Sequence, residues 1–390
     1  MSNPSDTRLP GSRTAWETRA TATGVIQQSV HSASLDSASE IKEAQYLLLQ
    51  VLWRSRQRQE FDWKLSGLDL WKNAAKAHCD TYKSWKLYCE DLAAGKTKKS
   101  EFQESSFAVV LLYQCQAANV NTMDMTPSVV VTPHEQRDLR KIPRINYDEN
   151  TILPEVDDLH ISSNPQTPVR SRILLDPDEE GLQRSSYKPS SPNVPEDIQR
   201  QIYKQSRDEQ IVNTALISFV NALTLHADIR VVWSLHRLPL KADFNPASYE
   251  ARTDGYLEIL TTADEKKRIR ALVEVKAAFR QKNGPAIRMQ EAAQVVAWLK
   301  SHPDRSGLLN KPGRRILLSQ DRHEIFITVA RYDDKYLDFL DGKPGPERAF
   351  MRMHEFGPWD TQSITDMKQV AVILIAMALR AEDDRIAENL

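Results

Sequence analysis

In the second half of the chain, short apolar runs alternate with longer stretches in which apolar residues recur at helical spacing. The run at 271–279 reads Ala-Leu-Val-Glu-Val-Lys-Ala-Ala-Phe, and its length and valine content predict a buried strand. Two opposite charges, Glu274 and Lys276, interrupt it. Side chains alternate along a strand, so these two lie on one face and Val275 lies on the other. Because an unpaired charge in a buried strand is costly, the pair indicates a functional site.

The same pattern predicts the elements around this strand. Helices are expected at 197–226, from Asn283-Gly284-Pro285 to Trp298, and at 364–380, and strands at 229–235, 254–260, 271–279, 315–319, 324–332 and 336–340, with a hairpin turn at 261–268. Pro285 suits the first turn of its helix, and Pro303 ends that helix. A helix, three strands, a helix and further strands predict an α/β (α+β) fold in which a mixed sheet is flanked by helices.

The first third of the chain predicts helices. Residues 1–36 are rich in Ser, Thr and Ala without apolar periodicity, and we expect them to be disordered. Ser37 and Glu40 form a capping-box pattern ahead of an apolar helix that runs through Leu52. Apolar positions then recur in steps of four and three from 71 to 92, which predicts one amphipathic helix, and a third helix is expected at 107–118. Together these segments predict a helical region at 37–120.

A proline-rich stretch separates this region from the strands. Ten of the twenty prolines lie between Pro127 and Pro195, among many Ser, Asp and Asn residues. This composition predicts a disordered linker at 121–196. Few contacts are expected to cross such a linker, so we expect 197–390 to fold as a separate domain.

Composition narrows the classes of function. The formal net charge is −1, so any contact with nucleic acid needs a local basic patch, for which 52 Lys and Arg residues are available. The odd number and wide spacing of Cys79, Cys89 and Cys115 suit reduced thiols and no zinc site. No apolar leader is visible, and the longest apolar run, at 370–379, is too short to span a bilayer. We therefore expect a nuclear or cytoplasmic protein that is neither secreted nor bound to a membrane.

Three motifs follow one another around the charged strand. Asp254 begins the strand before it, Glu274-Val-Lys276 lies twenty residues further on, and the next helix carries Gln290 and Gln294. An antiparallel pairing of the two strands would bring Asp254 beside Glu274. In order and spacing, these residues resemble the PD-(D/E)XK nuclease superfamily, and in particular a fungal family of PD-(D/E)XK nuclease-like domains.

The resemblance covers about half of the chain, from 197 to 380. It extends to the strand pair at 316–332, to Gly357-Pro-Trp359 and to the closing apolar helix. One departure is Thr253, which stands where the motif has proline. The family implies a restriction-endonuclease-like sheet and a nuclease that cleaves phosphodiester bonds in DNA.

The resemblance also implies a cofactor and a role for each residue. Phosphodiester cleavage needs an activated water and stabilisation of charge on the phosphate, and a divalent cation supplies both. Mg²⁺, or Mn²⁺, prefers oxygen ligands and takes one or two carboxylates from the protein. Asp254 and Glu274 are the expected ligands, with the Val275 carbonyl as a third oxygen. Lys276 is expected to orient the water or to stabilise charge.

Two further assignments stay open. Gln290 and Gln294 share a helix face, and related nucleases carry a Q-x-x-x-Y helix in which the glutamine holds the water or the DNA backbone. Here Trp298 comes two turns after Gln290 and Gln294 replaces the aromatic, so either glutamine fits the role. Glu209 fits a first-helix glutamate that reaches the metal, but with Ser206 it also fits a capping box.

Three functions therefore remain. The first is a magnesium-dependent nuclease that acts on DNA. The second is a catalytically degenerate nuclease fold that binds nucleic acid or protein, and the third is an interaction protein built on the N-terminal helices. The plain alternative for Glu274 and Lys276 is a salt bridge on an exposed sheet face, against which the flanking apolar residues argue.

Overall fold

The structure is a computed structural model that describes residues 8–119, 196–259, 269–303, 313–343 and 345–387, with side chains of the long helix from 209 onward. The predicted linker at 121–196, apart from residue 196, and the predicted turn at 261–268 lie outside the described residues. The described residues at 8–119 and 199–387 belong to one compact unit.

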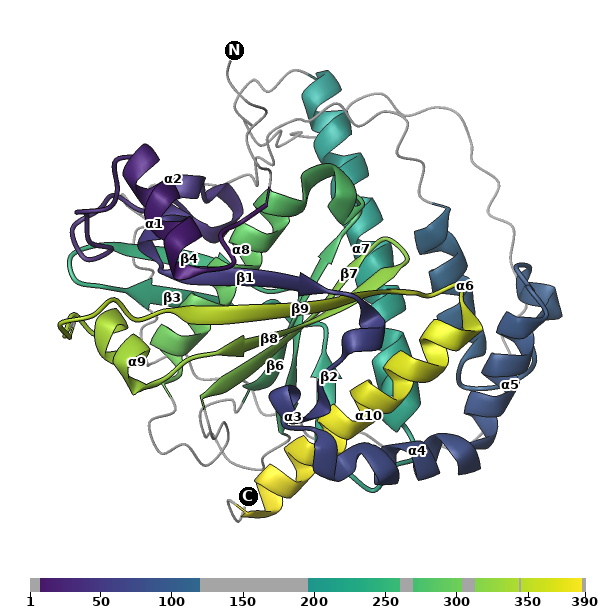
Figure 1. Cartoon of the computed structure of the whole chain (residues 1–390). Helices are drawn as coiled ribbons and strands as arrows, with labels where there is room; N and C mark the ends of the chain where they lie inside the picture. The colour runs from purple at the N-terminus through teal and green to yellow at the C-terminus, as the bar shows by residue number, and fades with distance from the viewer. Residues whose placement is uncertain (1–7, 120–195, 260–268, 304–312, 344, 388–390) are drawn as a thin grey trace, which may run out of the picture. The chain divides into compact units, whose positions relative to one another are not determined.

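A mixed sheet forms the centre of this unit (Figure 1). In the described residues its seven strands follow the order β1-β9-β8-β7-β6-β5-β2. Their bounds are β1 Val51–Arg56, β2 Val231–Ser234, β5 Gly255–Ile259, β6 Ile269–Lys276, β7 Arg314–Asp321, β8 Glu324–Arg331 and β9 Met351–Asp360. The pairs β1–β9 and β6–β7 are parallel and the other neighbours are antiparallel. A separate antiparallel hairpin consists of β3 Pro239–Asp243 and β4 Ser248–Arg252.

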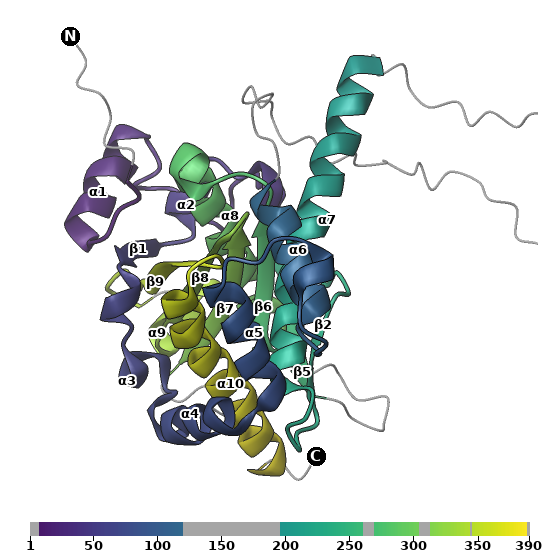
Figure 2. The same ribbon diagram turned by 90° about the vertical axis from the view of Figure 1, so that its right-hand side faces the viewer.

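Helices cover both faces of the sheet (Figures 1 and 2). One face carries α1 Arg13–Ala22, α2 Glu43–Leu48, α8 Arg280–Ser301, α9 Asp334–Leu340 and the β3–β4 hairpin. The other face carries α3 Trp63–Ser66, α4 Lys72–Thr81, α5 Lys83–Ala93, α6 Ala108–Ala118, α7 Glu196–Thr224 and α10 Ile364–Ala387. The mixed α/β sheet flanked by helices is therefore as predicted.

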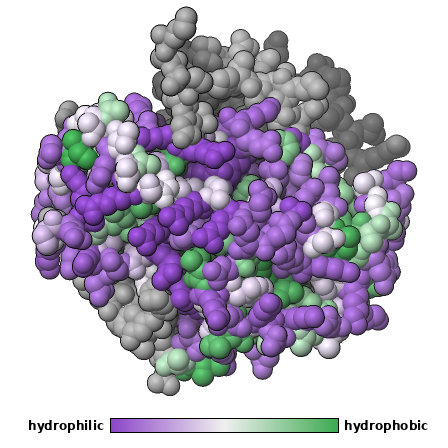
Figure 3. Space-filling view, viewed as in Figure 1, coloured by the Kyte–Doolittle hydropathy of each residue, from purple (hydrophilic) through white to green (hydrophobic). Residues whose placement is uncertain are grey.

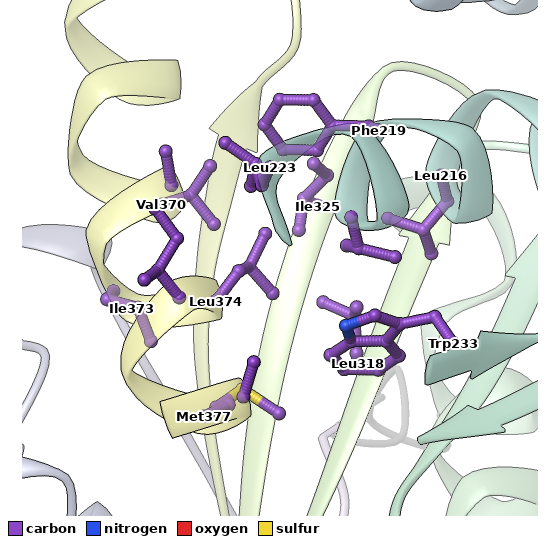
Figure 4. Packing of buried hydrophobic residues seen from close by; sticks show 14 of the residues in the cluster. Leu216, Phe219, Leu223, Trp233, Leu318, Ile325, Val370, Ile373, Leu374 and Met377 are labelled. Carbon is purple, nitrogen blue, oxygen red and sulfur yellow. The ribbon is translucent and has the colours of Figure 1, made fainter. Parts of the chain in front are cut away.

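The packing on the α7 and α10 face is dense and apolar. Figure 4 shows Phe219 and Leu223 of α7, Trp233 of β2 and Leu374 of α10 pointing toward one another above the sheet. Trp233 and Leu374 are nearly inaccessible to solvent, and so are the sheet residues beneath them. This core fixes α7 against the sheet and so fixes the helix that carries Glu209.

Helix α8 connects the parallel strands β6 and β7 across the opposite face, as a parallel pair requires. It is interrupted at Asn283, whose backbone is not helical, and the main helix continues past Pro285. This agrees with the predicted start at Asn283-Gly284-Pro285. From Glu291 to Leu299 every residue of α8 is buried. A helix buried on all sides holds its polar side chains in fixed positions next to the sheet.

The N-terminal segment contradicts two predictions. Residues 8–36 are folded: α1 packs against α2, Trp16 is 1% exposed and its indole N–H donates to the Leu47 carbonyl. The predicted helix through Leu52 ends at Leu48, because Gln50 takes a left-handed backbone conformation with φ of 52° and β1 follows. The predicted disorder of 1–36 is therefore wrong for 8–36, and residues 1–7 lie outside the described residues.

Other element predictions fare differently. The helix predicted from 71 to 92 is two helices that meet at Tyr82, whose ψ of 108° is not helical. The third helix is confirmed as α6. The strand expected at 336–340 is instead α9, which Asp333 caps by accepting from the Tyr336 N–H. Strands β3, β4 and β9 were not predicted.

The predicted division between a helical region at 37–120 and a domain at 197–390 is also wrong. Strand β1 pairs with β9, and aromatic residues of α5 pack on α7. Trp85 and Phe219 have ring centroids 6.2 Å apart, and both are in one apolar cluster with α10. The two parts therefore share a core, whatever their separation along the chain.

No helix in the described ranges combines the length and the apolar character that a bilayer crossing needs. The side of the molecule in Figure 3 is mostly hydrophilic, with hydrophobic residues in small separate groups.

The shared core predicts that residues 196–390 alone do not fold stably. Such a fragment leaves the β9 edge unpaired and uncovers the α7 and α10 residues that α5 and α6 bury. In the full chain, Trp85→Ala should lower the free energy of unfolding by about 3–5 kcal/mol, whereas Leu70→Ala, at an 80% exposed position, should change it by less than about 0.5 kcal/mol. Thermal melts followed by circular dichroism test both. Cooperative melting of the fragment at the temperature of the full chain would contradict the shared core.

Candidate active site

The Glu274 carboxylate lies at the centre of the candidate site. Glu274 is in β6, is 2% exposed and faces α8 on the sheet surface shared with Leu272. Lys276, two residues on, lies on the same face and donates from Nζ to Glu274 Oε1 at 2.7 Å. The plain alternative of an exposed surface pair is therefore wrong, because the Glu274 side chain is buried and that of Lys276 is 18% exposed.

Both glutamines of α8 bind this carboxylate. Gln290 Nε2 donates to Glu274 Oε1 at 2.7 Å, and Gln294 Nε2 donates to Glu274 Oε2 at 2.6 Å. Gln294 also donates to the Arg252 carbonyl at 2.9 Å. Because the two glutamines are one helical turn apart, one carboxylate reaches both. The structure thus brings both candidates to Glu274, while Trp298 is buried in the apolar layer.

Asp254 lies beside Glu274, one residue before β5. The register pairs Gly255 with Val273, so the next antiparallel positions are Asp254 and Glu274. Asp254 Oδ2 accepts from the Val275 N–H at 3.1 Å. Its other oxygen, Oδ1, lies 3.2 Å from a guanidinium nitrogen of Arg237, in the segment between β2 and β3. The predicted pairing of the two strands places these carboxylates in one cluster.

Val275 and Glu209 complete the set of predicted residues. In an extended strand the N–H and C=O of one residue point to the same side, so the Val275 carbonyl is on the side of Asp254. Glu209 is half-buried in α7, and its carboxyl interacts electrostatically with Lys276 and Asp254. Because α7 begins at Glu196, Ser206 lies inside the helix and does not cap it. The capping-box reading of Glu209 is therefore wrong.

Burial dominates the electrostatics of this cluster. Burial raises the pKa of Glu274, Lys276 opposes this effect and the neighbouring Asp254 carboxylate adds to it, and the resulting pKa is about 8. Burial alone would lower the pKa of Lys276, but the three carboxylates of Glu274, Glu209 and Asp254 outweigh it and raise the pKa above its usual value. Burial also raises the pKa of Glu209. With all three carboxyls ionised, the cluster would hold more negative charge than its two cations, Lys276 and Arg237, neutralise.

Three buried oxygen atoms around the cluster lack a hydrogen-bond partner among the described residues. They are Gln294 Oε1, Asn213 Oδ1 and Asp321 Oδ1. Asn213 also donates from Nδ2 to the Asp254 carbonyl at 2.8 Å, so its oxygen belongs to the same neighbourhood. Buried oxygens are expected to be satisfied, and a hard cation with its water shell is a partner that prefers oxygen.

The donor set fits Mg²⁺ or Mn²⁺. In the parts of the chain that the structure describes, no group of three or more His, Cys, Asp or Glu side chains is arranged to hold a metal ion. Mg²⁺ does not require such a group, because it usually binds one or two carboxylates and keeps several waters. Asp254, Glu274 and the Val275 carbonyl supply that smaller set.

A buried ionic network beside the site was not predicted. Arg280, 3% exposed, donates to Asp321 and Glu355 at 2.7 Å each and also binds Glu291. Arg288 donates to Glu355 at 2.8 and 2.9 Å. The sequence carries a signal for only one residue of this network: Asp321 is a charged residue at the end of the buried strand β7, as Lys276 is at the end of β6.

The network connects the site to a cleft. Lys276 opposes the burial that raises the pKa of Asp321, so these two groups are close. Asp321 binds Arg280, and Arg280 lines a cleft of about 400 Å³ at the start of α8. Other lining residues are Arg8, Ser55, Arg56, Gly284, Arg288 and Glu355. Residues of the ionic network therefore line a cleft that is open to solvent.

Comparison with models of known protein families gave no match, and a search of curated proteins found none that matches this chain.

The raised pKa of Glu274 predicts a pH-dependent stability in the presence of a chelator. The folded state keeps a proton up to about pH 8, whereas the unfolded carboxyl loses it near its usual 4.5. The protonated Glu274 carboxyl therefore stabilises the folded state fully below about pH 4.5, and this stabilisation is lost as the pH rises through about 8. In Glu274→Gln the decrease in the free energy of unfolding with rising pH should be smaller by about 1–3 kcal/mol, because the amide cannot ionise.

Urea unfolding of the parent and the variant at about pH 5, 6.5 and 8 measures this difference. Glu250→Gln, at an exposed position of β4, is the matched control and should follow the parent. Other buried carboxyls, such as Glu209, change the stability with pH in the same direction in the parent and in both variants. Only the difference between the parent and Glu274→Gln therefore reports on Glu274. Equal pH dependence in the parent and Glu274→Gln would show that Glu274 does not hold the proton.

Proposed function

We propose that the protein is a magnesium-dependent nuclease that cleaves phosphodiester bonds in DNA. The observation that carries this proposal is the buried, oxygen-rich cluster of Asp254, Glu274 and Gln294 beside Lys276. The resemblance to the PD-(D/E)XK superfamily implies that the reaction at this cluster is phosphodiester cleavage. The order α7, β2, β5, β6, α8, β7, with the last two strands parallel, supports a restriction-endonuclease-like core.

In this proposal Asp254, Glu274 and the Val275 carbonyl hold the cation, with Glu209 close enough to add a carboxylate. When bound, Mg²⁺ stabilises charge on the phosphate and makes a bound water more acidic. Its charge offsets the repulsion between Asp254 and Glu274, so the proton on Glu274 is no longer needed.

Lys276 acts as a cation in this proposal and not as a base. A general base must lose its proton near the working pH, and three carboxylates raise the pKa of Lys276 instead. Its ammonium can donate to a phosphate oxygen on which negative charge develops. The bond to Glu274 holds the ammonium in place before substrate arrives.

The two glutamines position the site. Gln290 and Gln294 hold both oxygens of Glu274 and so fix the plane of its carboxylate. The second amide atom of Gln294, Oε1, is a buried acceptor without a partner among the described residues, and it can orient a water. Gln294 therefore suits the water-holding role better than Gln290.

The degenerate alternative has one observation in its favour. Three protein donors already satisfy Glu274, and a backbone N–H and Arg237 satisfy Asp254. A cluster of this kind is stable without a cation, as expected for a nuclease-like fold that binds nucleic acid or protein without cutting. Nuclease activity distinguishes the two functions.

Cleavage of labelled single-stranded, double-stranded and branched DNA in about 5 mM Mg²⁺ tests the proposal. The parent should cut at least one of these substrates, and a chelator should stop it. Lys276→Ala and Asp254→Asn should each lower the rate by about a hundredfold or more, because each removes charge stabilisation at the reacting phosphate. Asp243→Asn, at an exposed carboxylate in a surface ion pair, is the matched control and should cut like the parent.

Thermal melting with the same ions provides a second readout. A cation with a dissociation constant of about 1 mM, present at about 10 mM, stabilises the folded state by about 1.4 kcal/mol. The parent and Lys276→Ala should show this gain, and Asp254→Asn should lose it. A gain in stability without cleavage of any substrate would favour the degenerate alternative. The absence of both the gain in stability and cleavage would refute the cation site.

A further inference from the structure

A group of arginines lies on the sheet face opposite α8. Arg54 and Arg56 are in β1, Arg331 is in β8 and Arg352 is in β9. The register pairs Arg54 with His354 and Arg331 with Arg352. Paired residues of neighbouring strands point to the same face, and so do residues two apart on one strand. These four side chains are called the arginine face.

The arginine face has little compensating charge. None of its four guanidinium groups makes an ion pair with a described residue, and Arg54 donates only to the Gly11 carbonyl at 3.1 Å. Arg54 and Arg352 are exposed, whereas Arg56 and Arg331 are half-buried. Four positive charges held this close repel one another, so an anionic partner would lower the free energy of this surface.

His354 reports the positive potential of this surface. It is 5% exposed, and its Nδ1 atom has no hydrogen-bond partner among the described residues. Burial lowers its pKa, the guanidinium groups of Arg56, Arg54, Arg331 and Arg352 act in the same direction, and together they bring the pKa to about 4.

The arginine face continues into the cleft. Arg56 belongs to the arginine face and also lines the cleft, together with Arg8 and Arg288. From there Arg280 and Asp321 lead to Lys276 in the candidate active site. A chain of phosphates that crosses β1 would therefore pass from the arginine face to the start of α8, where Arg8, Arg56 and Arg288 line the cleft together with Glu60, Glu324 and Glu355.

An apolar partner does not suit this surface. The exposed large hydrophobic side chains among the described residues lie elsewhere, at Leu70, Val109, Leu225, Leu235 and Ile386. Figure 3, on the side where β1 and β9 face the viewer, shows mostly hydrophilic residues. The partner that complements a row of arginines is a polyanion with regularly spaced charges.

We propose that the arginine face binds the sugar–phosphate backbone of a nucleic acid outside the candidate active site and directs the strand into the cleft. The choice of nucleic acid among polyanions rests on the proposed function, but binding does not require cleavage. Backbone contacts of this kind carry no sequence preference of their own and depend strongly on salt.

The test is fluorescence anisotropy of a labelled DNA duplex of about 30 base pairs with the full chain in a chelator, from about 50 to 200 mM salt. Arg54→Gln with Arg352→Gln removes the two exposed charges. Lys76→Gln with Lys86→Gln, on exposed positions of α4 and α5, changes the net charge equally and serves as the control.

Each phosphate contact scales the affinity for duplex DNA by about the salt concentration to the power −0.9. Loss of two contacts should therefore weaken binding about 25–30-fold near 0.15 M salt and flatten the slope of log K against log salt by about 1.8. The lysine control should bind like the parent. The histidine resonances of the parent should also show His354 titrating at a higher pH when DNA is bound, because the phosphates offset the arginine charges.

The outcomes separate this proposal from the nuclease proposal. Binding that depends on Arg54 and Arg352 supports the arginine face even when no DNA is cut in Mg²⁺. Equal affinity and equal salt slope in the arginine variant and the lysine control overturn it, even when the parent is an active nuclease. Binding of the parent to anionic vesicles or polyglutamate but not to DNA also overturns it.

Discussion

A carboxylate buried beneath a helix is the constraint on which the site depends. Glu274 is 2% exposed on a sheet face that α8 covers. An ionised carboxyl in that position is unfavourable unless donors compensate its charge. The chain supplies three donors, Lys276 from the same strand and Gln290 and Gln294 from α8. Even so, burial keeps the pKa of Glu274 near 8, so compensation by the protein is incomplete without a further cation or a proton.

The surrounding structure keeps those donors in place. Helix α8 is buried along its main part, and Arg280 at its start joins β7 and β9 through Asp321 and Glu355. Removing one partner of a buried ion pair leaves an uncompensated charge, so this network resists any displacement of α8. The same helix therefore provides the glutamines of the site and the network that lines the cleft.

Local spacing made the centre of the site predictable. Glu274 and Lys276 share a face because they are two apart on a strand, and Gln290 and Gln294 because they are four apart on a helix. Asp254 followed from the antiparallel pairing of two neighbouring strands. The partners of Arg280 come from β7, β9 and α8, which no local pattern connects. Arg237 was also missed, because it lies in an irregular segment between β2 and β3.

The N-terminal part shows the converse. The apolar residues at 51–53 continue the helical pattern before them, and the chain changes to a strand only because Gln50 adopts a positive φ that is uncommon outside glycine. A proline-rich linker indicates a long connection, but its composition does not determine whether the segments on either side share a core. Here they do, through β1 with β9 and through α5 with α7.

In the proposed site, Asp254 and Glu274 share a divalent cation. The most direct measurement is anomalous diffraction from crystals of the protein grown with Mn²⁺, compared with crystals of Asp254→Asn grown in the same way. A shared cation should give an anomalous peak between the carboxylates of Asp254 and Glu274, next to the Val275 carbonyl, and this peak should be absent in the variant. Ordered side chains at this place without a peak, or a peak bound only by other residues, would contradict it.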